Sequence, residues 1–276
     1  MKDATAPIYD YTAGRRPLVD ALGDIRAGLA RHRLAHEMAR RDFRNRYKGA
    51  VIGGLWMTIT TGLTALGLGL LYGKLLGHPI KDHLPYVAVG LVIWGTISGA
   101  ITEGSRTFLT GADMFKQMRT PLSIFAFRGS IRGGYSLLYR SFALVPVFLF
   151  AGLPSIGGTL LAGLGVIWVF FTGYWVSLLL GVLTARFRDI GQMAAAASSF
   201  AFFLTPIIWR VDRLGEYAHW VHWNPFYHYL EIVRTPLLGA EGLMFHWIVA
   251  VAITSGLAAL AFGVYARFFR RLPYWC

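Results

Sequence analysis

The sequence has 276 residues, of which 55% are hydrophobic and 15% are charged, whereas about 25% of the residues of an ordinary soluble domain are charged. Its 27 Lys and Arg residues outnumber 14 Asp and Glu residues, an excess that first suggests binding to nucleic acid. Long apolar runs separate the basic clusters and leave no continuous basic face, so we expect no nucleic-acid partner. Cys276 is the only cysteine, which excludes an internal disulfide.

The first 50 residues form a basic region before the first long apolar run. Between residues 15 and 48, apolar side chains recur among many arginines, at Leu18, Leu22, Ile25, Leu29, Leu34 and Met38. A basic amphipathic helix of this kind lies along the membrane surface. We therefore expect residues 1–50 to be a cytoplasmic region that contains one amphipathic interface helix.

Residues 40–48, which we call the basic collar, carry five cations and one acid, namely Arg40, Arg41, Arg44, Arg46, Lys48 and Asp42. No charged residue follows until Lys74. The positive-inside rule alone explains such a collar, because five cations are sufficient to keep the N-terminus in the cytoplasm. Gly49, Gly53 and Gly54 come next, and we expect them to permit close approach of a neighbouring backbone.

Six apolar stretches are long enough for membrane spans of roughly 20 residues. They lie at about 51–73, 84–103, 134–153, 158–183, 190–209 and 243–266. The third is the weakest, because Arg140 lies in its first turns, where we expect the long side chain to snorkel to the membrane surface. The pattern predicts an all-α integral membrane protein, with a six-span domain over residues 51–267 and a tail over 268–276.

The distribution of Lys and Arg predicts that both termini are cytoplasmic. Segments 1–50, 103–140, 186–189 and 267–276 hold 22 of the 27 basic residues. The segments predicted to lie outside hold the other five, which are Lys74, Lys81, Arg210, Arg213 and Arg234. Such a bias sets membrane orientation.

The long outer segment 210–241 is rich in aromatic residues and is broken at Asn224-Pro225 and Thr235-Pro236. It is typical of short helices that dip back into the membrane interface, which is allowed only where protein or water satisfies the broken backbone. Its aromatic rings are consistent with an interfacial belt. Rings that line a passage and stack on sugars are an open alternative.

Histidines in the same segment raise the question of a metal. His219 and His222 share a helical face, with His228 further along, but Glu216 is the only acid nearby and no cysteine accompanies them. This spacing is too loose to indicate a metal centre. We therefore predict no metal and assign the histidines to the aromatic belt.

This sequence contains no complete P-loop, the motif that binds ATP in transport ATPases. Residues 67–76 contain a Gly-Lys pair, but Leu68 and Leu75 stand where a P-loop needs its first glycine and its Ser or Thr. If transport is ATP-driven, ATP and Mg²⁺ are bound by another chain, and we predict no cofactor here. Glu103, expected to pair with Arg106, and His246 lie near span ends, which argues against an ion-coupled carrier.

Five motifs stand in the order seen in permease subunits of ABC exporters for polysaccharides. They are RDFRNRYKGAVIGGLW (41–56), LPYVAVGLVIW (84–94), RFRDI (186–190), TPIIW (205–209) and WNPFYHYLEIVR (223–234). From about residue 35 onward the chain resembles O-antigen, capsule and teichoic-acid export permeases, and it is most similar to the O-antigen type.

The resemblance implies a transporter subunit rather than an enzyme. It implies a homodimer in the bacterial cytoplasmic membrane, paired with two copies of a P-loop ATPase. Its substrate would be a polysaccharide on undecaprenyl diphosphate, moved through a channel at the dimer interface. An ABC permease for a drug or a small lipid is an alternative. A membrane-embedded transferase is a weaker one, since no nucleophile motif or buried acid pair is evident.

The resemblance also nominates site residues. The channel candidates are Trp56, Tyr72, Phe202, Phe203 and Trp209, and the outer gate candidates are Trp220, Trp223 and Tyr227. The ATPase-coupling candidates are Asp113, Phe115, Lys116 and Arg119 in a helix expected at 111–121, with Arg186, Arg188 and Asp189. In the collar, Arg44, Arg46 and Lys48 can offer charge-assisted hydrogen bonds to the lipid diphosphate.

Overall fold

The computed structural model describes residues 17–117 and 120–276, without the side chains of Phe115, Lys116, Gln117 and Arg213, and every regular element in these ranges is a helix. In chain order the α-helices are α1 Pro17–Ala30, α2 His32–Arg46, α3 Leu55–Leu76, α4 Ile80–Ser105, α5 Thr107–Gln117, α6 Ser123–Ser141, α7 Leu144–Ala151, α8 Ile156–Arg186, α9 Asp189–Leu204, α10 Ala218–Val221, α11 Pro225–Leu238, α12 Leu243–Phe268 and α13 Leu272–Trp275. Two 3₁₀-helices, η1 Val211–Tyr217 and η2 Phe269–Arg271, complete them. The all-α class is confirmed for the described residues.

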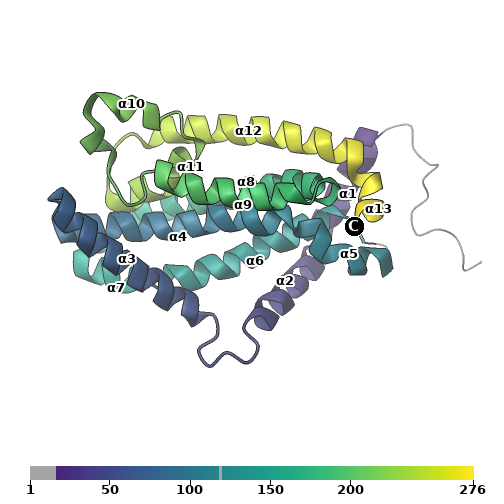
Figure 1. Ribbon diagram of the computed structural model, residues 1–276, viewed down its shortest axis with the longest axis horizontal. Coiled ribbons are helices and arrows are strands. Elements are labelled where there is room, and N and C mark those ends of the chain that lie inside the picture. Colours follow the sequence, from purple (N-terminus) through teal and green to yellow (C-terminus); the bar gives the residue numbers. More distant parts are fainter. Residues whose placement is uncertain (1–16, 118–119) are drawn as a thin grey trace, which may run out of the picture.

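The long helices run side by side along the longest axis of the molecule (Figure 1). Helices α4 and α8 form the centre of this bundle, with α6, α11 and α12 packed against α8, and α3 and α9 packed against α4. Helix α3 lies at the edge and is largely exposed. The described N-terminal helix α1, with α5 and α13, lies at one end, which we call the α5 end, and α10 lies at the opposite end (Figure 1).

Among the described residues, four helical stretches are long and apolar enough to cross a membrane, namely α3, α4, α8 and the run Leu243–Trp275 that starts with α12. Each begins and ends within a few residues of the corresponding prediction, apart from the longer end of the last run. Helices α6 and α7 form a fifth span if they are counted together. The predicted count of six spans is therefore not confirmed, because the described residues give four or five.

The predicted third and fifth spans are both interrupted. The third was expected to begin near Gly134, but α6 begins at Ser123 and is bent by 42° from α7. Pro146 explains the break, because a proline ring collides with the carbonyl of the residue four positions earlier, here Phe142. The fifth was expected to reach 209, but α9 ends after 16 residues at Leu204, since Thr205 precedes Pro206 and such a residue disfavours helix.

The N-terminal stretch predicted as one amphipathic helix forms two helices, α1 and α2, separated at Arg31. Helix α1 packs against α6 and α12, and α2 packs against α6. Ile25 and Met38 are buried in these contacts, whereas Leu18 and Leu29 stay exposed. Only part of the apolar face is therefore left for a membrane surface.

Segment 210–241 contains short helices, as expected, and the longest of them, α11, is buried within the bundle. The Asn224 side chain accepts a hydrogen bond from the Phe226 amide at 2.9 Å and so caps the start of α11. Residues 227–236 are all buried, against α4, α8 and α12. On α8, a Cβ at Gly165 would lie only 2.6 Å from the Ile232 carbonyl oxygen, so glycine permits this contact.

Candidate functional site

The candidate site begins where α2 leads into α3. A groove of about 620 Å³ lies there, which we call the collar groove, lined by Arg41, Phe43, Arg44, Asn45, Tyr47, Lys48, Gly54 and Tyr139. Two of the predicted phosphate ligands, Arg44 and Lys48, therefore share one groove. Arg41 adds a third cation that the sequence did not single out, and all three side chains are exposed.

Glycines shape the chain below this groove, but not all in the predicted way. A Cβ at Gly54 would lie 2.9 Å from the Tyr139 ring, so Gly54 permits close approach of a side chain and not of the backbone that was predicted. The prediction is also wrong for Gly49 and Gly53, which have nothing within 4 Å of such a Cβ. These two have φ of 84° and 54°, backbone angles that suit glycine, so they serve the turn itself.

Aromatic rings form one wall of the collar groove. Phe43 stacks on Tyr139, with ring centroids 5.2 Å apart and 17° between the planes, and the Tyr47 ring lies 5.1 Å from Phe43. Burial raises the pKa of Tyr47 above its usual value, so the phenol keeps its proton and can donate a hydrogen bond. The groove thus combines exposed cations, a neutral donor and a packed ring wall.

The acid of the collar faces the bundle rather than the groove. Asp42 accepts two hydrogen bonds from Arg128 on α6, at 2.5 Å and 2.6 Å, and lies 3.5 Å from Arg132. This paired geometry fixes α2 against α6. The collar cations in the groove are therefore not neutralised by their own acid.

Arg46 turns away from the collar groove. Its Nη2 atom lies 2.5 Å from Oε1 of Glu103 on α4, and the other oxygen of Glu103 accepts a hydrogen bond from Arg132 at 3.0 Å. The predicted pair between Glu103 and Arg106 is wrong, because Glu103 faces α2 and α6 whereas Arg106 is exposed. The three predicted phosphate ligands are thus split between two neighbouring sites.

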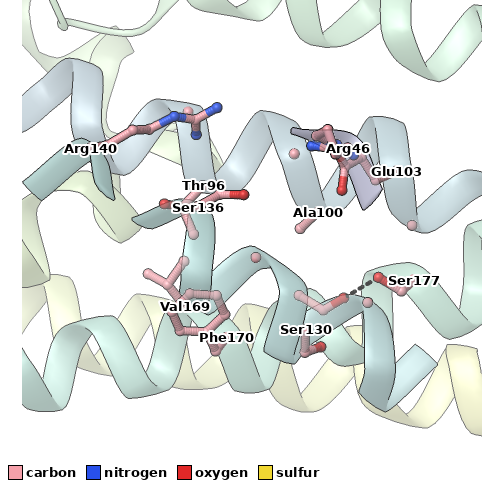
Figure 2. Close-up of a pocket in the computed structure, with 16 residues that line it drawn as sticks. Arg46, Thr96, Ala100, Glu103, Ser130, Ser136, Arg140, Val169, Phe170 and Ser177 are labelled. Carbon is pink, nitrogen blue, oxygen red and sulfur yellow. Dashed lines mark hydrogen bonds and ion pairs between the residues drawn. The ribbon is translucent and has the colours of Figure 1, made fainter. Parts of the chain in front are cut away.

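The second site is a smaller cavity of about 50 Å³ between α4, α6 and α8, which we call the bundle cavity. It is lined by Arg46, Gly95, Thr96, Gly99, Ala100, Glu103, Gly104, Gly129, Ser130, Gly133, Ser136, Arg140, Val169, Phe170, Gly173 and Ser177. Arg140 extends into it from α6, with Arg46 and Glu103 toward its other end (Figure 2). The guanidinium of Arg140 packs closely on α4, since a Cβ at Gly95 would overlap it; the predicted snorkelling of this side chain to the membrane surface stays a prediction.

Only some of the aromatic candidates for the channel and the outer gate lie together in the structure. A groove of about 810 Å³ near α10 is lined by Phe203, Trp209 and Trp220, together with Ala201, Leu204, Leu214, Tyr217, Val221, Asn224, Pro225 and Phe226. Two channel candidates and one gate candidate thus lie together, and Tyr217 and Phe226 join them without having been predicted.

The remaining aromatic candidates lie elsewhere. Trp56 is exposed and Tyr72 half-buried, both on α3. Phe202 packs against Trp94 with ring centroids 5.9 Å apart, and Trp223 is exposed. Tyr227 is buried with its ring 5.1 Å from that of His246. These five therefore do not line one common surface within the single chain.

Histidines pack around Tyr227 without forming a metal site. His228 Nδ1 lies 3.1 Å from His246 Nδ1, and His228 Nε2 lies 2.9 Å from the His222 carbonyl oxygen. His219 is separate and contacts the Glu216 carbonyl oxygen. In the described ranges, no three His, Cys, Asp or Glu residues are placed to hold a metal ion.

The coupling candidates gather at the α5 end. The helix expected at 111–121 begins earlier, since α5 starts at Thr107, and Asp113 on it is exposed. The side chains of Phe115 and Lys116, and the whole of Arg119, lie outside the described residues. Their placement therefore stays a prediction.

The turn between α8 and α9 holds the other coupling candidates, Arg186, Arg188 and Asp189, all of which are exposed. The Arg186 guanidinium lies 5.6 Å from the centroid of the Trp275 ring. Helix α13, which carries Trp275, also packs against α5. The C-terminal helix, which the sequence did not nominate, therefore links the two predicted coupling elements.

A buried ion pair connects three of the sequence motifs. Arg234 binds Glu231 and donates a hydrogen bond to the Pro206 carbonyl oxygen at 2.8 Å. Its guanidinium lies 3.8 Å from the Tyr86 ring centroid, and the Tyr86 hydroxyl donates to the same carbonyl at 3.1 Å. In the sequence, Arg234 was counted only among the basic residues of segment 210–241 and its burial was not predicted, yet its side chain is only 1% exposed.

A family model described as ABC-2 type transporter matches residues 34–238, which include both the collar groove and the bundle cavity. The chain belongs to this family. It is therefore a multi-pass membrane subunit of an ABC transporter, a class that works with an ATPase partner.

Individual relatives narrow the class further. An O-antigen export system permease protein RfbA from Klebsiella pneumoniae is 25% identical over 191 residues, covering 67% of this chain and 72% of the relative. Another from the same species is 23% identical over 190 residues, with the same coverage. A protein of the same name from Myxococcus xanthus is 22% identical over 184 residues, covering 65% and 69%. The resemblance to polysaccharide export permeases is thereby confirmed.

Proposed function

We propose that the chain is the membrane subunit of an exporter that moves a polysaccharide carried on undecaprenyl diphosphate out of the cytoplasm. The observation that carries this proposal is the collar groove. Arg41, Arg44 and Lys48 line it beside the packed rings of Phe43 and Tyr139. Charge-assisted hydrogen bonds from Arg and Lys suit a diphosphate, and the groove lies where the first candidate span begins.

The assembly that this function needs contains more than one chain. Two copies of the chain pair in the bacterial inner membrane, with both termini in the cytoplasm, and two P-loop ATPase subunits bind ATP and Mg²⁺. The ATPase docks at the α5 end on α5 and on the turn that holds Arg186, Arg188 and Asp189. Exposed arginines beside aromatic rings, here Phe187 and Trp275, are typical of protein contacts.

The polymer itself follows the lipid head through a channel between the two copies. On each copy, the groove that holds Phe203, Trp209 and Trp220 forms the outer part of this path. Flat aromatic rings suit the apolar faces of sugar rings. Closure of the ATPase pair on ATP moves the coupling elements and widens the path. The polymer is an O-antigen in this proposal, with capsule or teichoic-acid polymers as variants of the same chemistry.

A second candidate function, export of a drug or a small lipid, is favoured by one other feature. A groove of about 630 Å³ between α3, α4 and α7 is lined almost wholly by apolar side chains, including Leu63, Leu66, Leu84 and Val147. An apolar molecule without a long polymer would fit such a surface.

Paired substitutions in the collar groove test the proposed function. We expect the double variant Arg44→Gln, Lys48→Gln to insert normally but to lose at least about tenfold in export, because each lost charge-assisted bond weakens binding by roughly tenfold. The exchange Arg44→Lys, Lys48→Arg should retain most of the export. Arg33→Gln, at an exposed site on the same helix, is the matched control.

The readout is the amount of polymer at the cell surface and the amount of lipid-linked polymer retained inside. Membrane insertion is measured in parallel on the same cells. Wild-type export by a normally inserted Gln double variant would refute the phosphate role of the collar groove and leave orientation as its only function.

A further inference from the structure

Arg140 is placed where a membrane protein rarely puts an arginine. It is the next-to-last residue of α6, at the break before α7, and its guanidinium extends into the bundle cavity (Figure 2). An ionisable group inside a candidate span is costly and marks a functional site by default. Broken spans are tolerated where they line a polar cavity.

The surroundings of Arg140 do not neutralise it. No hydrogen bond or ion pair joins its guanidinium to any residue in the described ranges. Glu103 is the acid that lines the cavity, and it is already shared by Arg46 and Arg132. The cavity hydroxyls of Thr96 and Ser136 donate to carbonyl oxygens of their own helices, and a hydroxyl carries no charge that could balance the guanidinium.

The space beside Arg140 is made by small residues. Gly95 has no Cβ, and a Cβ there would overlap the guanidinium. Gly99 on α4, Gly133 on α6 and Gly173 on α8 also line the cavity, and none of them brings a side chain into it. A cavity of about 50 Å³ holds roughly three to five water molecules, which is the scale of a single phosphoryl group.

The charges around the cavity also favour an anion. Two arginines, Arg46 and Arg140, line the cavity with one acid, Glu103, and Glu103 is also paired with Arg132. Arg46 lines the cavity, and its neighbour in sequence, Tyr47, lines the collar groove. The two sites therefore adjoin along the chain at Arg46 and Tyr47.

We propose that the bundle cavity binds a phosphoryl group, held by the Arg140 guanidinium with Arg46 at its mouth. This inference rests on the proposed function, because the phosphoryl group belongs to the lipid diphosphate after it leaves the collar groove. To hold it, Arg46 exchanges Glu103 for the phosphate, and Glu103 keeps Arg132. Gly95 is a positioning residue, since its lack of a side chain lets Arg140 reach the cavity.

Binding measurements on the purified full-length chain in detergent test this site. The probes are inorganic diphosphate, undecaprenyl diphosphate and undecaprenol, which separate a free anion, a lipid anion and a lipid without phosphate. We expect Arg140→Gln to weaken binding of both diphosphates by at least about tenfold. Arg140→Lys should weaken it less, and Arg106→Gln, at an exposed site of the same charge, should not change it.

A second variant, which keeps Arg140, controls for a loss of binding that is caused by misfolding. Gly95→Ala displaces the guanidinium without removing it, and it should weaken binding in the same direction. Thermal unfolding curves establish that each variant is folded. If folded Arg140→Gln binds both diphosphates as tightly as Arg106→Gln does, the inference is wrong.

The same data separate the two proposals. Weakening by the collar double variant but not by Arg140→Gln would support the proposed function and overturn the bundle-cavity site. Equal binding of undecaprenol and undecaprenyl diphosphate by the wild-type chain would overturn the proposed substrate. Binding of inorganic diphosphate that depends on Arg140 would still support an anion site in that case.

Discussion

At the scale of single residues, charge alone did not reveal which side chains are buried. Arg234 looks like other basic residues of an outer segment, yet it lies inside the bundle against Glu231 and Tyr86. The predicted partner of Glu103 was Arg106, one helical turn away, but Glu103 pairs with Arg46 and Arg132 on other helices. Such contacts depend on which helix faces meet, and local spacing carries no information about that.

The buried pair gives a stability prediction. Glu231→Gln should lower the free energy of unfolding by about 3–5 kcal/mol, because it leaves Arg234 buried without a counter-charge. Thermal unfolding of the chain in detergent measures this. Glu241→Gln, at an exposed acid a few residues away, should leave the unfolding temperature unchanged. Equal unfolding temperatures for both variants would show that the pair does not hold the three motifs together.

At the scale of helices, hydropathy located the long uninterrupted spans but not the breaks. Helices α3, α4 and α8 were predicted within a few residues, since each is one apolar run. The apolar run through Pro146 conceals the bend between α6 and α7, because proline breaks a helix without changing hydropathy. The deep position of α11 was also hidden, since it depends on glycines in another helix.

Those glycines give a second stability prediction. Gly165→Ala should push α11 away from α8, because the new Cβ would lie 2.6 Å from the Ile232 carbonyl oxygen. Overpacking of this kind costs about 1–3 kcal/mol, a fall of several degrees in the unfolding temperature. Gly163→Ala, two residues earlier with nothing within 4 Å of its Cβ, is the control. A fall of the same size in both variants would contradict close α8–α11 packing as the cause.

At the scale of the whole molecule, the sequence predicted the class and the family better than the site. The ordered motifs indicated a polysaccharide export permease, which the comparisons confirm. Arg44 and Lys48 could be nominated because they stand in a dense basic run beside the first span, and the structure places both in the collar groove. The bundle cavity was not predicted, because it depends on Arg140 meeting Gly95 across 45 positions of the chain.

Removal of the chain from the bacterium that carries it shows whether the chain exports a lipid-linked polysaccharide. The quantity measured is polymer on undecaprenyl diphosphate, inside the cell and at its surface. We expect polymer to accumulate inside, still attached to its lipid, and surface polymer to return when the wild-type gene is restored. Unchanged surface polymer, with loss of export of a drug or small lipid instead, would contradict the account.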